Sequence, residues 1–232
     1  MSPHTSPAFE LTRLFTEHKF FVLFVYLLLA LLLYPQLLNS GYGYLVFRIV
    51  GSAGILLTVY AISLRRSVLI AGLLLAVPAL LHRMLLFEAD AGLLPLLGIV
   101  LSFAFDVFVV VVIFRRVFTR EQPNSETVFG ALCIYLLVGF SFASAYAMVA
   151  KLQPKAFYLD PLTNLHTVPD RFDFVYYSFA TMTSLGAAGI TALSNQARSL
   201  SITEAILGVL YLAVLIARLM AAYRPPSLER HD

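Results

Sequence analysis

The chain has 232 residues, of which 60% are hydrophobic and only 12% charged, and its formal net charge is +3. With a mean hydropathy of +0.85, this composition lies far outside the range of soluble domains and predicts a polytopic membrane protein. The basic residues cluster in short loops beside apolar runs, which indicates membrane topology rather than a nucleic-acid partner. The single cysteine, Cys133, excludes a disulfide within the chain and argues against metal or redox chemistry based on Cys and His.

Six apolar runs come near the length of about 20 residues that a bilayer core requires. They cover residues 19–38, 44–64, 68–87, 93–114, 128–150 and 202–222. Basic residues precede the first run and follow the second, fourth and sixth, at Arg13, Lys19, Arg65, Arg66, Arg115, Arg116, Arg120, Arg224 and Arg230. By the positive-inside rule, both termini are expected to face the cytoplasm. The first run is long and lacks a small-residue cleavage site, so we interpret it as a retained anchor.

Four ionisable side chains lie within the second to fourth runs, where lipid makes them costly and a functional role is the default hypothesis. These are Arg48, His82, Arg83 and Asp106. We favour a structural ion pair of Arg48 or Arg83 with Asp106, and a hydrogen-bonded packing role for His82. The fourth run lacks the regularly spaced arginines that a voltage sensor needs. Residues 1–122 are therefore predicted to form a four-helix transmembrane domain without an arginine-rich voltage sensor.

The connection between the fifth and sixth runs departs from a simple turn. Residues 151–170 form a polar loop with three prolines, and residues 172–183 form an amphipathic stretch that is too short to span a bilayer. We predict a re-entrant helix, with Asp170 as its N-cap. The segment "SLGAAG", residues 184–189, is then non-helical backbone at membrane depth. Because a membrane tolerates such backbone only where protein buries it or water bathes it, the segment is predicted to line an aqueous path.

The order of span, outer loop, tyrosine pair, short helix, "TMTSLG" and final span resembles the pore module of the potassium channel superfamily, over roughly residues 128–223. The last span also resembles that of small bacterial members. The resemblance implies that Tyr176 and Tyr177 form the aromatic cuff of an ion filter. It implies that the first four filter positions are Thr183, Ser184, Leu185 and Gly186.

A filter of this kind replaces the hydration shell of a monovalent cation, K⁺ or Na⁺, with rings of backbone carbonyls. Each chain has one such segment, so four chains are needed to close the ring and a homotetramer is expected. The resemblance therefore implies an all-α membrane protein with six transmembrane helices, a pore domain over residues 123–224 and a short cytoplasmic tail over residues 225–232. The expected location is a cell membrane, the bacterial inner membrane by the same resemblance, with lipid as the surrounding partner and no cofactor.

The outer half of the filter departs from the family pattern. Aligned without an insertion, Ala187 replaces an aromatic residue, Ala188 the second glycine and Gly189 an acidic residue that anchors the filter. The angles of the second glycine cost an L-residue roughly 1–2 kcal/mol, and Ala180 stands where some members place a glutamate. We expect the inner ion sites to survive and selectivity among monovalent cations to be weak. The sequence does not separate a natural from an engineered filter, and a non-conducting homologue acting as a scaffold or regulatory subunit is the alternative.

The final span carries three further candidates. Gly208 is either a gating hinge or a site of close helix packing. Glu204, near the outer end of the span, either accepts hydrogen bonds that brace the filter or pairs with Arg198. Arg218 is either a snorkelling side chain or a partner in a pair between subunits.

Two other classes of protein fit the sequence less well. An intramembrane enzyme would need paired groups at membrane depth, but Ser184 has no evident His partner because His166 belongs to the outer loop. A secondary transporter should contain internal repeats or paired broken helices, whereas this sequence has one broken segment.

Overall fold

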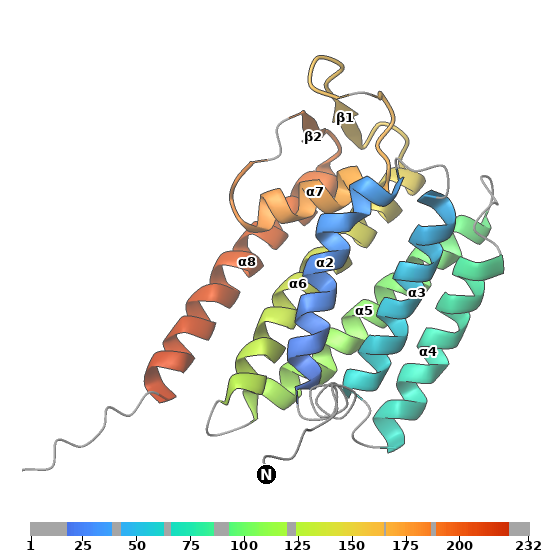
Figure 1. Ribbon diagram of the computed structural model, residues 1–232. Coiled ribbons are helices and arrows are strands. Elements are labelled where there is room, and N and C mark those ends of the chain that lie inside the picture. The colour runs from blue at the N-terminus through green and yellow to red at the C-terminus, as the bar shows by residue number, and fades with distance from the viewer. Residues whose placement is uncertain are drawn as a thin grey trace, which may run out of the picture.

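The computed structural model describes residues 18–38, 43–62, 66–85, 93–119, 124–164, 166–186 and 189–222. Within these ranges the chain forms seven helices and two short strands (Figure 1). In chain order they are α2 (Lys19–Leu38), α3 (Gly43–Ile62), α4 (Arg66–Leu85), α5 (Leu93–Phe118), α6 (Ser125–Leu152), β1 (Phe157–Leu159), α7 (Arg171–Met182), β2 (Ile190–Ala192) and α8 (Asn195–Ala222). The all-α prediction is confirmed, apart from two strands of three residues each.

Helices occupy all six predicted spans, apart from residues 63–64 and 86–87, which lie outside the described residues. Among the described residues, three helices are long and apolar enough to cross a membrane, over Leu96–Phe118, Ser125–Leu152 and Asn195–Ala221. Shorter apolar helices cover Lys19–Leu33, Ile49–Ile62 and Arg66–Leu81. The multi-pass membrane architecture is therefore confirmed, while the count of six spans stays a prediction.

Two of the long helices begin earlier than their apolar runs. α6 begins after Asn124, whose side chain accepts a hydrogen bond from the backbone N–H of Thr127 in a capping box. α8 begins after Ser194, whose Oγ accepts a bond of 3.1 Å from the backbone N–H of Ala197. A polar first turn is satisfied by such caps rather than by burial. Hydrophobicity thus locates the apolar part of a helix, and capping residues locate its start.

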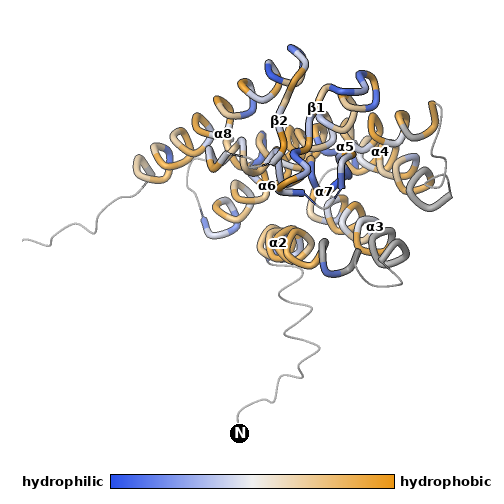
Figure 2. The backbone as a smooth tube through the Cα atoms, turned by 90° about the horizontal axis from the view of Figure 1, so that it is seen from above, coloured by the Kyte–Doolittle hydropathy of each residue, from blue (hydrophilic) through white to orange (hydrophobic). Residues whose placement is uncertain are grey.

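α6 is the centre of the packing, because it contacts α2, α5, α7 and α8. α2 to α5 pack against one another beside it, and one buried apolar cluster joins all five helices, with Phe20, Val59, Val109 and Ile134 among its members. By contrast, α8 lies at the edge of the bundle, and hydrophobic residues follow its length (Figure 2). In the most apolar stretch of α6, 56% of the residues are buried, whereas in that of α8 only 17% are.

α7 lies crosswise to α6 at one end of the bundle, below the two strands (Figure 1). β1 and β2 pair antiparallel, with Phe157 opposite Ala192 and Leu159 opposite Ile190. A second apolar cluster joins these strands to α6 and α7, and includes Tyr146. The strand pair therefore ties the loop before α7 to the segment that follows the predicted filter.

Cationic side chains lie over aromatic rings near the opposite end of the bundle. The guanidinium of Arg218 lies 4.6 Å from the ring centre of Phe118, and that of Arg116 lies 4.7 Å from that of Phe20. Such contacts are favourable for a guanidinium that is partly removed from water. Arg218 thus joins the end of α8 to the end of α5 within one chain.

Candidate functional site

α7 begins where the sequence predicted. Asp170 is the N-cap, its Oδ1 accepts a bond of 2.9 Å from the backbone N–H of Asp173, and Oδ2 of Asp173 accepts one of 2.8 Å from the backbone N–H of Asp170. His166 lies 2.7 Å from the same Oδ2 of Asp173. That hydrogen bond raises the pKa of His166. The ligand atoms of these three side chains lie within 4.8 Å of one another, but both carboxylates already serve the helix cap.

α7 ends in a turn made by Thr183 to Gly186. Backbone N–H groups point back to the helix: that of Ser184 donates to the carbonyl of Thr181 at 3.1 Å, and those of Leu185 and Gly186 donate to the carbonyl of Ala180 at 2.9 and 3.2 Å. Ser184 and Gly186 have φ values of 58° and 81°, so the backbone is non-helical as predicted.

The carbonyl groups of this turn differ from its N–H groups in their hydrogen bonding. In the described part of the chain, no hydrogen bond is accepted by the carbonyls of residues 183–186. All four of these residues are exposed in the single chain, and Leu185 is 77% exposed. The hydroxyl of Thr183 donates to the carbonyl of Phe179 at 2.6 Å, which leaves its lone pairs available as acceptors. The oxygen atoms of this turn are therefore left without hydrogen-bond donors in the described part of the chain.

Behind α7 lies a fully buried polar cluster centred on Glu204, whose exposed fraction is 0%. Its Oε2 lies 2.5 Å from the hydroxyl of Tyr146 on α6, and its Oε1 lies 2.5 Å from the hydroxyl of Ser178 on α7. Arg198, the alternative partner, donates from Nε to the carbonyl of Ala192 at 3.1 Å. Glu204 thus joins the three helices of this region by hydrogen bonds.

The cluster contains more acceptors than hydroxyl protons. Ser178 Oγ also lies 2.7 Å from the carbonyl of Gly139, and one hydroxyl proton cannot serve both that carbonyl and Glu204. A proton on Glu204 completes the chain of bonds: Tyr146 donates to the carboxyl, the carboxyl donates to Ser178, and Ser178 donates to Gly139. Each buried polar atom then has a partner, which is the usual condition in a protein interior.

The tyrosine pair is divided between two environments. Tyr177 is 8% exposed, its hydroxyl lies 2.7 Å from Ser201 Oγ, and its ring packs edge-on against Tyr146 with centroids 4.9 Å apart. Tyr176 is 39% exposed. Within one chain, therefore, only the second tyrosine is positioned to brace the helix that leads to the turn. Ala180, which stands where some members of the related family have a glutamate, is 2% exposed.

Gly189 is held by the outer loop. Its carbonyl accepts bonds from the backbone N–H of Asp160 at 2.8 Å and from Asn164 Nδ2 at 2.9 Å. Its φ is +87°, and a Cβ built there would lie 2.3 Å from Thr163 Oγ1. The outer loop therefore holds the backbone of residue 189, and the positive φ together with the contact to Thr163 favours glycine at this position. Ala187 and Ala188 lie outside the described residues.

Gly208 is where α8 approaches the end of α7. A Cβ at this position would lie 2.6 Å from both Cγ and the carbonyl oxygen of Met182. Close packing thus accounts for the glycine, and a hinge at Gly208 stays a prediction. The side chains of Arg48, His82 and Arg83 lie outside the described part, so their predicted pairing is untested.

Sequence reasoning did not find four of the residues that position this site. Tyr146 lies in an apolar run as one aromatic among many, and Ser178 is one of several small residues on α7. Asp160 and Asn164 act through a backbone N–H and an amide in a loop that has no regular pattern. The available signal was Glu204 itself, because a carboxyl buried in an apolar helix needs partners from neighbouring helices.

α7 is a short helix packed against two long apolar helices, α6 and α8, and the residues of the turn at its end are exposed. Residues 125–224 match the sequence model of a protein family described as ion channel, and α6, α7 and α8 lie within the match. This part of the chain is an ion-channel pore region, and the match is to channels rather than to enzymes. Comparison with curated proteins and with solved structures finds no match.

Proposed function

We propose that the chain is one subunit of a homotetrameric channel for monovalent cations, with weak selectivity between K⁺ and Na⁺. The observation that carries the proposal is the turn at Thr183 to Gly186, where N–H groups bond to α7 and the carbonyls accept no bond in the described part. Four such turns around an axis would supply rings of oxygen atoms in place of a hydration shell.

The exposed surfaces support four copies rather than one. α8 carries large apolar side chains that are more than half exposed, including Ile202, Val209, Leu210 and Ile216. Leu185 is also exposed, at the turn itself. Lipid would not cover this side chain if the turn lines a water-filled path, so a neighbouring subunit would have to. Neighbouring subunits would bury the turn and part of α8, and lipid would cover the remainder. In the proposed membrane orientation both termini lie in the cytoplasm, as the positive-inside rule predicts.

The proposed division of the chain is residues 1–122 as a four-helix domain, residues 123–224 as the pore domain and residues 225–232 as a tail. Filter support is assigned to Tyr177 and Glu204, which are buried behind α7, and the ion-binding oxygens to Thr183, Ser184, Leu185 and Gly186. Weak selectivity is assigned to the outer half of the filter, where Ala187 and Ala188 lack the aromatic ring and the glycine of the related pattern.

The test measures ion flux and reversal potentials of the purified protein in liposomes and planar bilayers. We expect wild type to pass K⁺ and Na⁺ at comparable rates, and the double variant Ala187→Tyr/Ala188→Gly to favour K⁺. Gly189 is kept, because any side chain there would meet Thr163. Wild type that already selects K⁺ as strongly as the variant contradicts weak selectivity. A protein that passes no ion supports the alternative, a non-conducting homologue. The molecular mass of the purified complex tests the tetramer, and a mass other than that of four chains contradicts it.

A further inference from the structure

The filter segment, residues 183–189, is held at both ends by other parts of the same chain. At its inner end, the N–H groups of residues 184–186 donate to carbonyls of α7. At its outer end, the carbonyl of Gly189 accepts bonds from the backbone N–H of Asp160 at 2.8 Å and from Asn164 Nδ2 at 2.9 Å. A carbonyl oxygen has two lone pairs. The outer loop uses both of those at Gly189, so this oxygen is an attachment point for the segment.

Residues 160–164 form a compact turn that presents the two donors. The carbonyl of Asp160 accepts bonds from the backbone N–H groups of Thr163 and Asn164 at 3.2 and 3.1 Å. These bonds close the turn without the amide of Asn164. One proton of that amide serves the carbonyl of Asp160, at 2.9 Å, and the other is available for Gly189. The distinct contribution of the Asn164 side chain is therefore its bond to the filter segment.

The turn stands on a well-packed part of the chain. It continues from β1, which pairs with β2 directly after Gly189. Leu159 and Ile190 face each other in this pair, are 3% and 4% exposed, and belong to the apolar cluster that includes residues of α6 and α7. Because the two donors have a packed base, they can fix the position of the Gly189 carbonyl.

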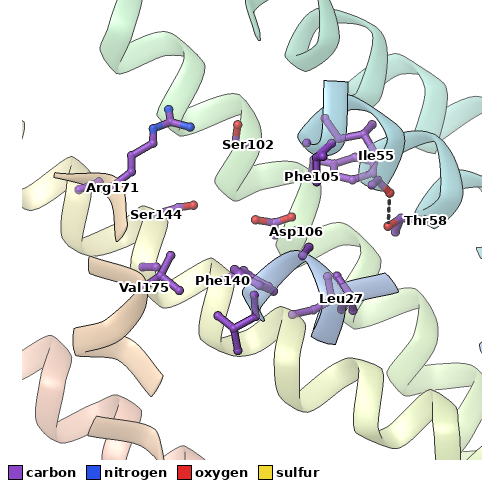
Figure 3. Close-up of a pocket in the computed structure, with 18 of the residues that line it drawn as sticks. Leu27, Ile55, Thr58, Ser102, Phe105, Asp106, Phe140, Ser144, Arg171 and Val175 are labelled. Atoms are coloured by element: carbon purple, nitrogen blue, oxygen red, sulfur yellow. Dashed lines mark hydrogen bonds between the residues drawn. The ribbon is translucent and has the colours of Figure 1, made fainter. Parts of the chain in front are cut away.

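The helices α2 to α5 give this end of the segment little further support. α7 packs mainly against α6 and α8. A cavity of about 220 Å³ separates it from the other helices, with Arg171 and Val175 of α7 on one side and Phe105 of α5 on the other (Figure 3). The sequence also lacks the aromatic and acidic side chains that hold this part of a filter in the related pattern, at Ala187 and Gly189. The outer loop is therefore the main support.

We propose that Asn164 is a positioning residue that limits the size of the cation that the channel admits. This inference rests on the proposed function. In a ring of four subunits, the width at the outer end of the ion path depends on where each chain holds its backbone. The bond from Asn164 holds that backbone at Gly189. Without the bond, the outer end widens and admits larger cations, while the oxygen atoms of residues 183–186 stay the same.

The test is the permeability of dimethylammonium relative to K⁺, obtained from reversal potentials of the full-length protein in planar bilayers. Loss of one hydrogen bond changes an equilibrium about fivefold, so we expect Asn164→Ala to raise this ratio by about that factor. Asn164→Asp has the same shape but no N–H donor, and it should raise the ratio as well. Asn195→Asp is the matched control, because it adds the same charge at the exposed start of α8. Its ratio should equal that of wild type.

Thermal unfolding separates this role from a purely structural one. The turn keeps its backbone bonds in both Asn164 variants, so we expect melting temperatures close to that of wild type together with the changed ratio. A ratio that stays at the wild-type value in both variants overturns this inference and leaves the channel proposal intact, as does a wild type that passes dimethylammonium as readily as K⁺. A wild type that passes no cation overturns the channel proposal, and this inference with it.

A second measurement needs neither a folded variant nor conduction. In wild type labelled with ¹⁵N in the asparagine side chains and ¹³C in the glycine carbonyls, solid-state NMR should show magnetisation transfer between Asn164 Nδ2 and the carbonyl carbon of Gly189. The hydrogen bond brings these two atoms close together. Absence of that transfer overturns the role of Asn164, whatever the variants do.

Discussion

The two sides of α7 differ in how complete they are within one chain. On the side that faces α6 and α8, Tyr177, Ser178 and Met182 are 8%, 0% and 1% exposed. On the other side, Tyr176 is 39% exposed and Leu185, just after the helix, 77%. The buried side holds its polar atoms in hydrogen bonds, and the exposed side ends in carbonyls without donors in the described part. The buried side is thus complete within a single chain, whereas the exposed side is the surface that further copies would cover in the proposed channel.

Removing the centre of the buried side should have the largest effect. Glu204→Ala leaves the hydroxyl of Tyr146 without its acceptor and that of Ser178 without its partner at residue 204, and it opens a void, so we expect the free energy of unfolding to fall by about 3–5 kcal/mol. Glu204→Gln should retain most of the stability, because its amide can donate to Ser178 while its oxygen accepts from Tyr146. Denaturant unfolding in detergent measures both, and an alanine variant as stable as wild type would refute the bracing role.

On the exposed side, substitutions at two glycines with similar φ values distinguish the cost of backbone strain from the cost of a steric clash. Gly186 and Gly189 have φ values of +81° and +87°, but a Cβ at Gly186 meets nothing within 4 Å, whereas one at Gly189 meets Thr163. We expect Gly186→Ala to cost about 1–2 kcal/mol and Gly189→Ala about 2–3 kcal/mol of unfolding free energy. Equal losses in the two variants, measured by thermal unfolding, would argue against the anchor at the outer loop.

The contact between Gly208 and Met182 tests whether α8 is fixed to α7 or bends there. Gly208→Ala should destabilise the protein by about 1–2 kcal/mol through overpacking. Met182→Ala in the same chain should recover only part of that loss, because it removes the contact with Cγ but leaves the backbone carbonyl oxygen of residue 182 in place. The coupling is obtained from a double-mutant cycle of unfolding free energies. A hinge role predicts instead that Gly208→Ala alters channel opening and that Met182→Ala gives no recovery.

The smallest effect is expected at the start of α7, where His166 bonds to Asp173. The hydrogen bond raises the pKa of the imidazole, so its stabilising contribution is fully present below the unfolded pKa and is lost as the pH rises through the folded pKa. We expect the melting temperature of wild type to fall slightly as the pH rises through the folded pKa of His166, and that of His166→Asn to show no such fall. A melting temperature that rises with pH, or the same pH dependence in the variant, would contradict this assignment.

The helices and the start of α7 could be predicted from local sequence signals, whereas the contacts between distant parts of the chain could not. The apolar runs predicted helices because their length reflects a bilayer, and Asp170 predicted the start of α7 because capping acts within one turn. The pairing of β1 with β2 was missed, since strands of three residues carry no periodicity. The partners of Glu204 were missed as well, because Tyr146 is separated from it by three other elements in the chain.

The bond between Asp160 and Gly189 and the strand pair beside it have a consequence for biogenesis. The re-entrant segment leaves and returns at one point, where its two ends are clipped together. We therefore expect residues 160–189 to form one closed loop whose two ends stay on the same side of the membrane. Assembly of the ion path then requires neither end of this loop to cross the bilayer.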